Sequence, residues 1–212
     1  MESLISAQLS QYIHDHTTPE DALYERLRQE TFDQLEDPQM QVGRVEGAFL
    51  RMMVQVTGAR RILELGTFSG YSALSMASGL PADGRLITCD MDPVVTAVAQ
   101  RYFDESPWGA QIEIRLGPAL ETLATLQGEE FDLVFLDADK ENYVHYWQAV
   151  IPMLRTGGVV LADNTLWSGA VLDPQRDSDH GIVNFNTMVT EDPRVDNVLL
   201  SVRDGVMFAR KR

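Results

Sequence analysis

The chain has 212 residues and a formal net charge of −15 at pH 7, with 32 Asp and Glu against 17 Lys and Arg. A field of this sign repels phosphate backbones, so nucleic acid is disfavoured as a partner. Cys89 is the only cysteine, which excludes an internal disulfide and indicates a reducing compartment. The sequence shows no signal-peptide pattern and no apolar run near the roughly 20 residues of a membrane span, so we expect a cytoplasmic protein without membrane contact.

Three helices are predicted before the first strand. Residues 3–16 and about 19–35 carry apolar side chains near helical spacing, with Ser3 placed to cap the first helix and Pro19 in the first turn of the second. A third helix is predicted at about 44–57. Because the first two helices precede any strand, we expect them to form a cap over the sheet or a surface for a partner.

From Arg60 onward, short apolar runs alternate with amphipathic segments, which is typical of a parallel sheet with helices on both faces. The predicted strands lie at about 61–65, 86–90, 112–116, 131–136, 158–162, 198–202 and 206–209. The predicted helices between them lie at about 71–79, 93–105, 118–126 and 142–155. Asp204 and Gly205 are typical of a hairpin turn, so the last strand should run antiparallel to its neighbour.

These elements predict one α/β domain over residues 1–212, with a Rossmann-like, doubly wound sheet of seven strands and an antiparallel last strand. Residues 1–37 would form its helical N-terminal cap and residues 38–212 its core. Residues 173–180 form a polar stretch, and we expect a mobile surface insertion there.

A glycine-containing turn follows the first predicted strand. Glu64 lies at the end of the apolar run, and Gly66 and Gly70 lie in the turn that leads into the next helix. Glycine permits backbone conformations and close approaches that a Cβ would block. The turn is therefore either a ligand-binding loop at the carboxyl edge of the sheet or an ordinary strand-to-helix connection. It lacks the third glycine of the dinucleotide fingerprint, which disfavours a nicotinamide-dependent dehydrogenase.

Asp90 closes the second predicted strand, 26 residues after Glu64. A carboxylate at this position can accept hydrogen bonds from both hydroxyls of a ribose, although an acid here also commonly caps the next helix. Since the glycine turn belongs to the same edge of the sheet, adenosine binding is the better interpretation.

The fourth and fifth predicted strands deliver Asp137, Asp163 and Asn164 to the same edge. Two carboxylates and an amide oxygen are hard ligands that suit Mg²⁺, Ca²⁺ or Mn²⁺. The same residues could instead cap helices and tie loops, so the pattern alone leaves both interpretations open. The four histidines show no paired spacing and one cysteine cannot build a zinc cage.

Three segments carry a resemblance to a known family. Residues 63–72, 135–143 and 157–169 resemble, in this order, motifs of the small cation-dependent O-methyltransferases, which include catechol and caffeoyl-CoA O-methyltransferases. The resemblance extends from about residue 38 to residue 212, and Asp137-Ala138-Asp139-Lys140 has the form found in the plant and bacterial branch. Glu46 departs from the animal catechol enzyme, which has a basic residue at this position.

The resemblance implies a methyl donor, a divalent cation and a homodimer. The donor is S-adenosylmethionine, and the cation is Mg²⁺ in first place, with Ca²⁺ or Mn²⁺ as alternatives. The family's cofactor contacts fall on Met40, Val42, Glu64, Gly66, Ser72, Asp90, Ala119 and Asp137. The metal ligands fall on Asp137, Asp163 and Asn164, the catalytic base on Lys140, and a wall of the acceptor pocket on Trp167.

The expected reaction is therefore methylation of a hydroxyl on a small vicinal diphenol, such as a catechol or a caffeoyl-like acceptor. A divalent cation favours the phenolate and fixes its aim, and it also favours the neutral form of Lys140 that accepts a proton. The alternative role of Lys140 is an ion pair with Asp137 or Asp139. The alternative functions are methylation of a hydroxylated tRNA nucleoside by the same mechanism and a regulator that only senses the cofactor.

Overall fold

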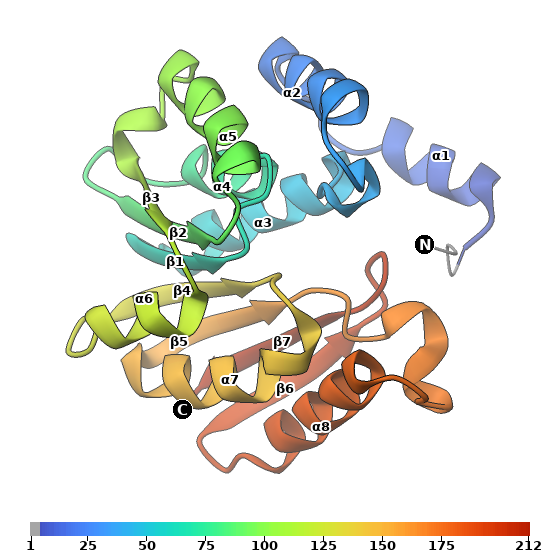
Figure 1. Cartoon of the computed structure of the whole chain (residues 1–212), viewed down its shortest axis with the longest axis vertical. Helices are drawn as coiled ribbons and strands as arrows, with labels where there is room; N and C mark the ends of the chain where they lie inside the picture. The colour runs from blue at the N-terminus through green and yellow to red at the C-terminus, as the bar shows by residue number, and fades with distance from the viewer. Residues whose placement is uncertain (1–4) are drawn as a thin grey trace.

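The computed structural model describes residues 5–212, in which the central element is a sheet of seven strands (Figure 1). The strands are β1 (Arg61–Leu65), β2 (Arg85–Asp90), β3 (Ile112–Leu116), β4 (Phe131–Leu136), β5 (Leu154–Ala162), β6 (Val195–Leu200) and β7 (Val206–Lys211). Their order is β3-β2-β1-β4-β5-β7-β6, and β7 runs antiparallel to both of its neighbours. This topology confirms the predicted fold class. The strand order reverses between β1 and β4, where doubly wound sheets bind their ligands.

Helices cover both faces of the sheet. The α-helices of the described residues are α1 (Ala7–Asp15), α2 (Ala22–Gln34), α3 (Arg44–Thr57), α4 (Tyr71–Ala77), α5 (Pro93–Glu105), α6 (Ala119–Thr125), α7 (Tyr143–Met153) and α8 (Asp177–Glu191). The 3-10 helices are η1 (Pro38–Met40), η2 (Gly109–Gln111), η3 (Lys140–Asn142) and η4 (Trp167–Leu172). Side chains alternate along each strand, so Ile62 and Leu133 pack with α3, α4 and α5, whereas Leu63 and Val134 pack with α6, α7 and α8 (Figure 1). No helix within residues 5–212 is long and apolar enough to cross a membrane.

The two N-terminal helices begin later than predicted. α1 has Ser6 as its N-cap, and Ser3 lies outside the described residues. α2 begins beyond Pro19 because the side chain of Asp21 accepts a hydrogen bond from the backbone of the first turn, which makes Asp21 the N-cap. α2 packs on the core through Leu27, whereas no side chain of α1 is buried and this helix lies at the outer edge of the molecule (Figure 1).

α8 corrects the expectation of a surface insertion at residues 173–180. The last four of these residues form the first turn of α8, which continues to Glu191. Ile182, Phe185 and Val189 of α8 follow helical spacing, and they form the face of this helix that is fully buried in the core. Residues 173–180 include no part of this apolar pattern, because the first turn of the helix is polar and the pattern starts at Ile182.

Candidate active site

A cavity of about 1400 Å³ opens at the carboxyl ends of β1, β2, β4 and β5. It is larger than the roughly 300–1,000 Å³ that is typical of a site for one small ligand, so it can hold a donor and an acceptor together. Most of the predicted site residues line this cavity: Met40, Val42, Gly66, Ser72, Asp90, Ala119, Asp137, Lys140, Asn164 and Trp167. Glu64 and Asp163 are buried beside them at the ends of β1 and β5.

Gly66 joins the glycine turn to the end of β4. Its φ is +100°, and a Cβ at this position would lie 2.0 Å from the carbonyl oxygen of Asp137. Both the left-handed backbone and the close approach therefore require glycine. Gly70, with φ +88°, then allows the chain to turn into α4.

Asp90 holds the same turn from β2. Its Oδ2 accepts hydrogen bonds from the backbone N–H groups of Thr67 and Phe68, at 3.0 and 2.8 Å. The N-cap of α5 is Asp92, whose side chain accepts from the backbone of Val94 at 2.7 Å. The helix-cap role that the sequence left open for Asp90 is thus filled by Asp92, and Asp90 remains at the cavity wall.

Glu64 is a buried acid whose two oxygens have no well-formed hydrogen bond, although the hydroxyls of Ser72 and Thr88 are near enough to favour its charged form. Burial raises the pKa of Glu64 to about 8, because the charged form is poorly solvated there. A buried acid without a well-formed hydrogen bond is costly in the ligand-free protein. A cationic group brought by a ligand would remove that cost.

Lys140 lies in η3 and is almost fully buried. Its Nζ donates to Asp137 Oδ1 at 2.8 Å and to the hydroxyl of Tyr143 at 2.7 Å. The Tyr143 hydroxyl in turn donates to the carbonyl of Asp163 at 3.0 Å, and burial raises the pKa of Tyr143 well above its usual value, so it stays neutral. Of the two ion-pair partners considered for Lys140, Asp137 is the one in contact, since Asp139 accepts from Tyr146 and Asn142 instead.

Asp163 and Asn164 follow β5 directly. Oδ2 of Asp163 accepts from the side-chain amide of Asn164 at 2.9 Å, whereas Oδ1 is buried without a partner. Burial raises the pKa of Asp163 well above its usual value, and the nearby charges of Glu46 and Asp137 add to this shift. Residues 5–212 contain no group of three or more His, Cys, Asp or Glu side chains arranged for a metal, so a cation here depends on the Asn164 amide oxygen and on water.

Four further residues shape this region, and the sequence assigned none of them a role in the site. Glu46 of α3 is fully buried and forms an ion pair with Arg203, which lines the cavity from the turn between β6 and β7. Asp204 and Asp179 are buried acids that contact the segment after β5. Only Glu46 could have been noticed in the sequence, because it replaces the basic residue of the animal catechol enzyme. The contacts of Arg203, Asp204 and Asp179 join residues that are distant along the chain.

Residues 14–212 match a family model whose description is O-methyltransferase. The chain belongs to the O-methyltransferase family. It is 39% identical over 170 residues to the catechol O-methyltransferase of Niastella koreensis, with 78% of this chain and 77% of the relative covered. It is 33% identical over 179 residues to the caffeoyl-CoA O-methyltransferase of Petroselinum crispum, with 78% and 74% covered.

Solved O-methyltransferases share the whole fold. The O-methyltransferase from Bacillus cereus in complex with SAH has a TM-score of 0.90 and 30% identity, with 97% of each chain covered. TomG from Streptomyces achromogenes, in complex with SAM, has a TM-score of 0.87 and 30% identity, with 96% of each chain covered. The predicted family, fold class and enzyme class of this O-methyltransferase are thereby confirmed, whereas the roles of individual site residues stay predictions.

Proposed function

We propose that this O-methyltransferase transfers a methyl group from S-adenosylmethionine to one hydroxyl of a small vicinal diphenol, with the help of a divalent cation. The observation that carries the proposal is the position of Lys140, Asp137 and Asn164 on the wall of the same cavity as Gly66 and Asp90. The names of the Niastella and Petroselinum relatives support the acceptor class, and the cofactors in the Bacillus and Streptomyces structures support the donor.

The donor half of the cavity is built from the ends of β1 and β2. We assign the methionine ammonium to Glu64, whose unpartnered carboxylate suits a cation. Asp90 would accept the ribose hydroxyls with the lone pairs that its backbone partners leave. Gly66, Ser72 and Ala119 would contact the methionine and adenine parts. Met40 and Val42, which also line the cavity, would close over the donor.

Asp137, Asp163 and Asn164 fit a divalent cation. The orphaned Oδ1 of Asp163 and the mutual repulsion of the two carboxylates are the features that a cation would relieve. Oxygen ligands of this kind favour Mg²⁺, with Ca²⁺ or Mn²⁺ as alternatives. When bound, such an ion lowers the pKa of a phenol and fixes the direction of its oxygens.

Lys140 would take the proton of the acceptor. Its Nζ is fixed by Asp137 and Tyr143 at the boundary between the donor half and Trp167, whose ring centroid is 5.8 Å away. The acceptor oxygen attacks the methyl carbon in line with the sulfur, so one C–O bond forms as one C–S bond breaks. The sulfonium would become the neutral thioether of S-adenosylhomocysteine. The hydroxyl proton would move to the neutral amine of Lys140, which forms when the ammonium that pairs with Asp137 has released a proton to solvent.

The test is methyl transfer from labelled S-adenosylmethionine to a panel of vicinal diphenols, with bulk tRNA assayed in parallel. We expect label on the diphenols and none on tRNA, because the net charge of −15 opposes phosphate contacts. Label on tRNA alone would replace the proposed acceptor by a nucleoside. Binding of the cofactor without any transfer would instead favour a sensor.

We also propose a homodimer. Leu9 and Tyr12 of α1 are 55% and 60% exposed, and no side chain of this helix is buried by the rest of the chain. An apolar helix face of this kind is stabilised when a second copy covers it. Light scattering tests the proposal, since it predicts twice the mass of the 23.8 kDa chain.

A further inference from the structure

The segment after β5 has a backbone that non-glycine residues rarely adopt. Trp167 and Ser168 have φ values of +49° and +52°, and Asn164 has +59°. Left-handed conformations at such residues persist only where the surrounding structure holds them, and they concentrate at functional sites. Trp167 therefore needs specific contacts to keep its place on the cavity wall.

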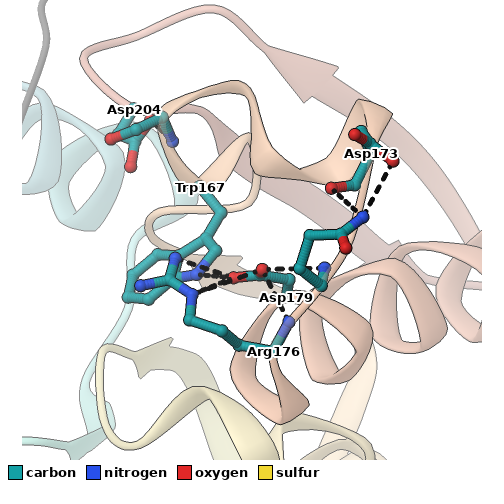
Figure 2. Close-up of polar contacts among 7 residues, drawn as sticks. Trp167, Asp173, Arg176, Asp179 and Asp204 are labelled. Atoms are coloured by element: carbon teal, nitrogen blue, oxygen red, sulfur yellow. Dashed lines mark hydrogen bonds and ion pairs between the residues drawn. The ribbon is translucent and has the colours of Figure 1, made fainter.

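Two buried carboxylates supply these contacts (Figure 2). Asp204 accepts from the backbone N–H of Ser168 at 2.6 Å. Asp179, from the first turn of α8, accepts from the indole Nε1–H of Trp167 at 2.9 Å. Asp204 thus holds the backbone of the segment, and Asp179 holds the ring.

Asp179 is itself held in one position. Its Oδ2 accepts from the backbone N–H groups of Gln175 and Arg176 at 3.1 and 3.0 Å, and its Oδ1 forms an ion pair with the Arg176 guanidinium at 2.8 Å. Figure 2 shows the side chains of Trp167 and Arg176 converging on this carboxylate. These donors hold the pKa of Asp179 well below its usual range, so the carboxylate is charged, although the side chain is only 3% exposed.

The indole ring that Asp179 holds lies in the candidate active site. Trp167 lines the cavity, and Lys140 Nζ lies 5.8 Å from the ring centroid. Asp179 is not part of the cavity wall, so it acts on an acceptor through the wall residues that it holds, which are Trp167 and its ion-pair partner Arg176. A planar acceptor that packs against the indole would tilt with it, and the tilt decides which of two vicinal hydroxyls lies in line with the methyl group.

We propose that Asp179 is a positioning residue that fixes the indole of Trp167 and thereby sets which hydroxyl of the acceptor is methylated. The inference rests on the proposed diphenol acceptor for its kinetic consequence. Its structural part, the control of Trp167 by Asp179, does not depend on the identity of the acceptor.

The chain offers a matched control at the other end of α8. Asp192 accepts from the indole Nε1–H of Trp147 at 3.0 Å and forms an ion pair with Arg194 at 2.6 Å. Its side chain is 6% exposed, close to the 3% of Asp179. Trp147 is fully buried in the core and is absent from the cavity wall, so loss of Asp192 affects stability alone.

The experiment compares Asp179→Ala, Trp167→Phe, the double variant and Asp192→Ala with the wild type. The readouts are the ratio of the two monomethylated products of a catechol substituted at carbon 4, the KM for this acceptor, the KM for S-adenosylmethionine and the Tm. We expect Asp179→Ala and Trp167→Phe to move the product ratio and the acceptor KM by about tenfold, as for loss of one hydrogen bond to a charged group. In the Trp167→Phe background, Asp179→Ala should not change the product ratio further, because the indole N–H that Asp179 accepts is already absent.

Asp192→Ala should lower the Tm and leave the product ratio and both KM values as in the wild type. Asp179→Asn keeps only one accepting oxygen, which cannot serve both the indole Nε1–H and the backbone N–H groups of Gln175 and Arg176, so its product ratio should lie between those of the wild type and Asp179→Ala. The proposal is overturned if Asp179→Ala lowers the Tm as Asp192→Ala does and leaves the product ratio unchanged. Additive effects in the double variant would overturn it as well.

A measurement without turnover separates this inference from the proposed function. The fluorescence emission of Trp167 is obtained by subtraction of two spectra. In the wild-type background it is the spectrum of the wild type minus that of Trp167→Phe. In the Asp179→Ala background it is the spectrum of Asp179→Ala minus that of the double variant. Asp179→Ala should shift this emission to longer wavelength and increase its quenching by acrylamide. If the wild type methylates no diphenol but the emission shifts, the proposed acceptor is wrong and the control of Trp167 by Asp179 stands; an unchanged emission rejects that control.

Discussion

Gly66 lies so close to Asp137 that a Cβ on the glycine would be 2.0 Å from the carbonyl oxygen of Asp137. The contact joins the turn after β1 to the end of β4, and hence the donor half of the cavity to Lys140 and the candidate cation ligands. The two halves of the site share one rigid edge of the sheet, and a change at Gly66 should reach both.

Gly66→Ala should therefore lower both stability and turnover. Overpacking against the Asp137 backbone costs about 1–3 kcal/mol, in addition to the strain of a left-handed alanine. Gly128→Ala is the matched control, since Gly128 also has a positive φ of +91° but no atom within 4 Å of the added Cβ. Urea unfolding should show the larger loss for Gly66→Ala, and equal losses for the two variants would contradict the role of the close approach.

Lys140→Met should reduce kcat by about 10²–10⁴, the usual contribution of a general base, while the KM for S-adenosylmethionine changes little. Lys211 is the only other lysine in the chain and binds the carbonyls of Ile151 and Leu154 away from the cavity. Steady-state kinetics of Lys211→Met should match the wild type once stability is accounted for. A wild-type kcat in Lys140→Met would reject Lys140 as the base.

Glu64 should make the stability of the cofactor-free protein depend on pH. Its folded-state pKa of about 8 lies above the ordinary value of 4.5, so the folded state keeps a proton that the unfolded state releases. The contribution of Glu64 to the free energy of unfolding is therefore highest below pH 4.5, falls as the pH rises towards 8, and is constant above.

Glu64→Gln lacks this titration and isolates it. The advantage of Glu64→Gln over the wild type in urea unfolding should grow between pH 5 and pH 8. Saturating S-adenosylhomocysteine should reverse the advantage, because its ammonium would pair with the ionised Glu64. A difference that is independent of both pH and ligand would contradict the assignment of Glu64 to the methionine ammonium.

Arg203→Ala should destabilise the fold through Glu46. The ion pair compensates a carboxylate that is fully buried, and burial already raises the pKa of Glu46 despite the nearby guanidinium. Removal of one partner from a buried pair costs about 3–5 kcal/mol. The double variant Glu46→Gln with Arg203→Ala should regain part of this loss in thermal unfolding. Additive losses would show that Arg203 acts independently of Glu46.

The strands and most helices could be predicted because the apolar periodicity and the residues at their ends are local features of the sequence. α3 and α5 begin and end where the sequence predicts them, since Gly58 and the Asp92-Pro93 start are explicit boundary signals. α8 escaped prediction because its first turn is polar and is held by the contact of Asp179 with Trp167. That contact exists only in the folded chain.

Some features of the candidate site could likewise be predicted from the sequence, and others could not. Acids and glycines at strand ends could be placed at one edge, because parallel strands bring their carboxyl ends together. The unpartnered state of Glu64 could not be foreseen, since it depends on what the surrounding elements fail to offer. Arg203 is 157 residues from Glu46, so only the fold reveals that pair.

Metal dependence of methyl transfer is the most direct test of the proposed function. The wild-type protein would be treated with excess EDTA, assayed with labelled S-adenosylmethionine and a catechol, and then assayed again after addition of Mg²⁺. We predict that transfer to the catechol stops in EDTA and returns with Mg²⁺, and that Asp163→Ala does not recover. Full transfer in excess EDTA would contradict the account.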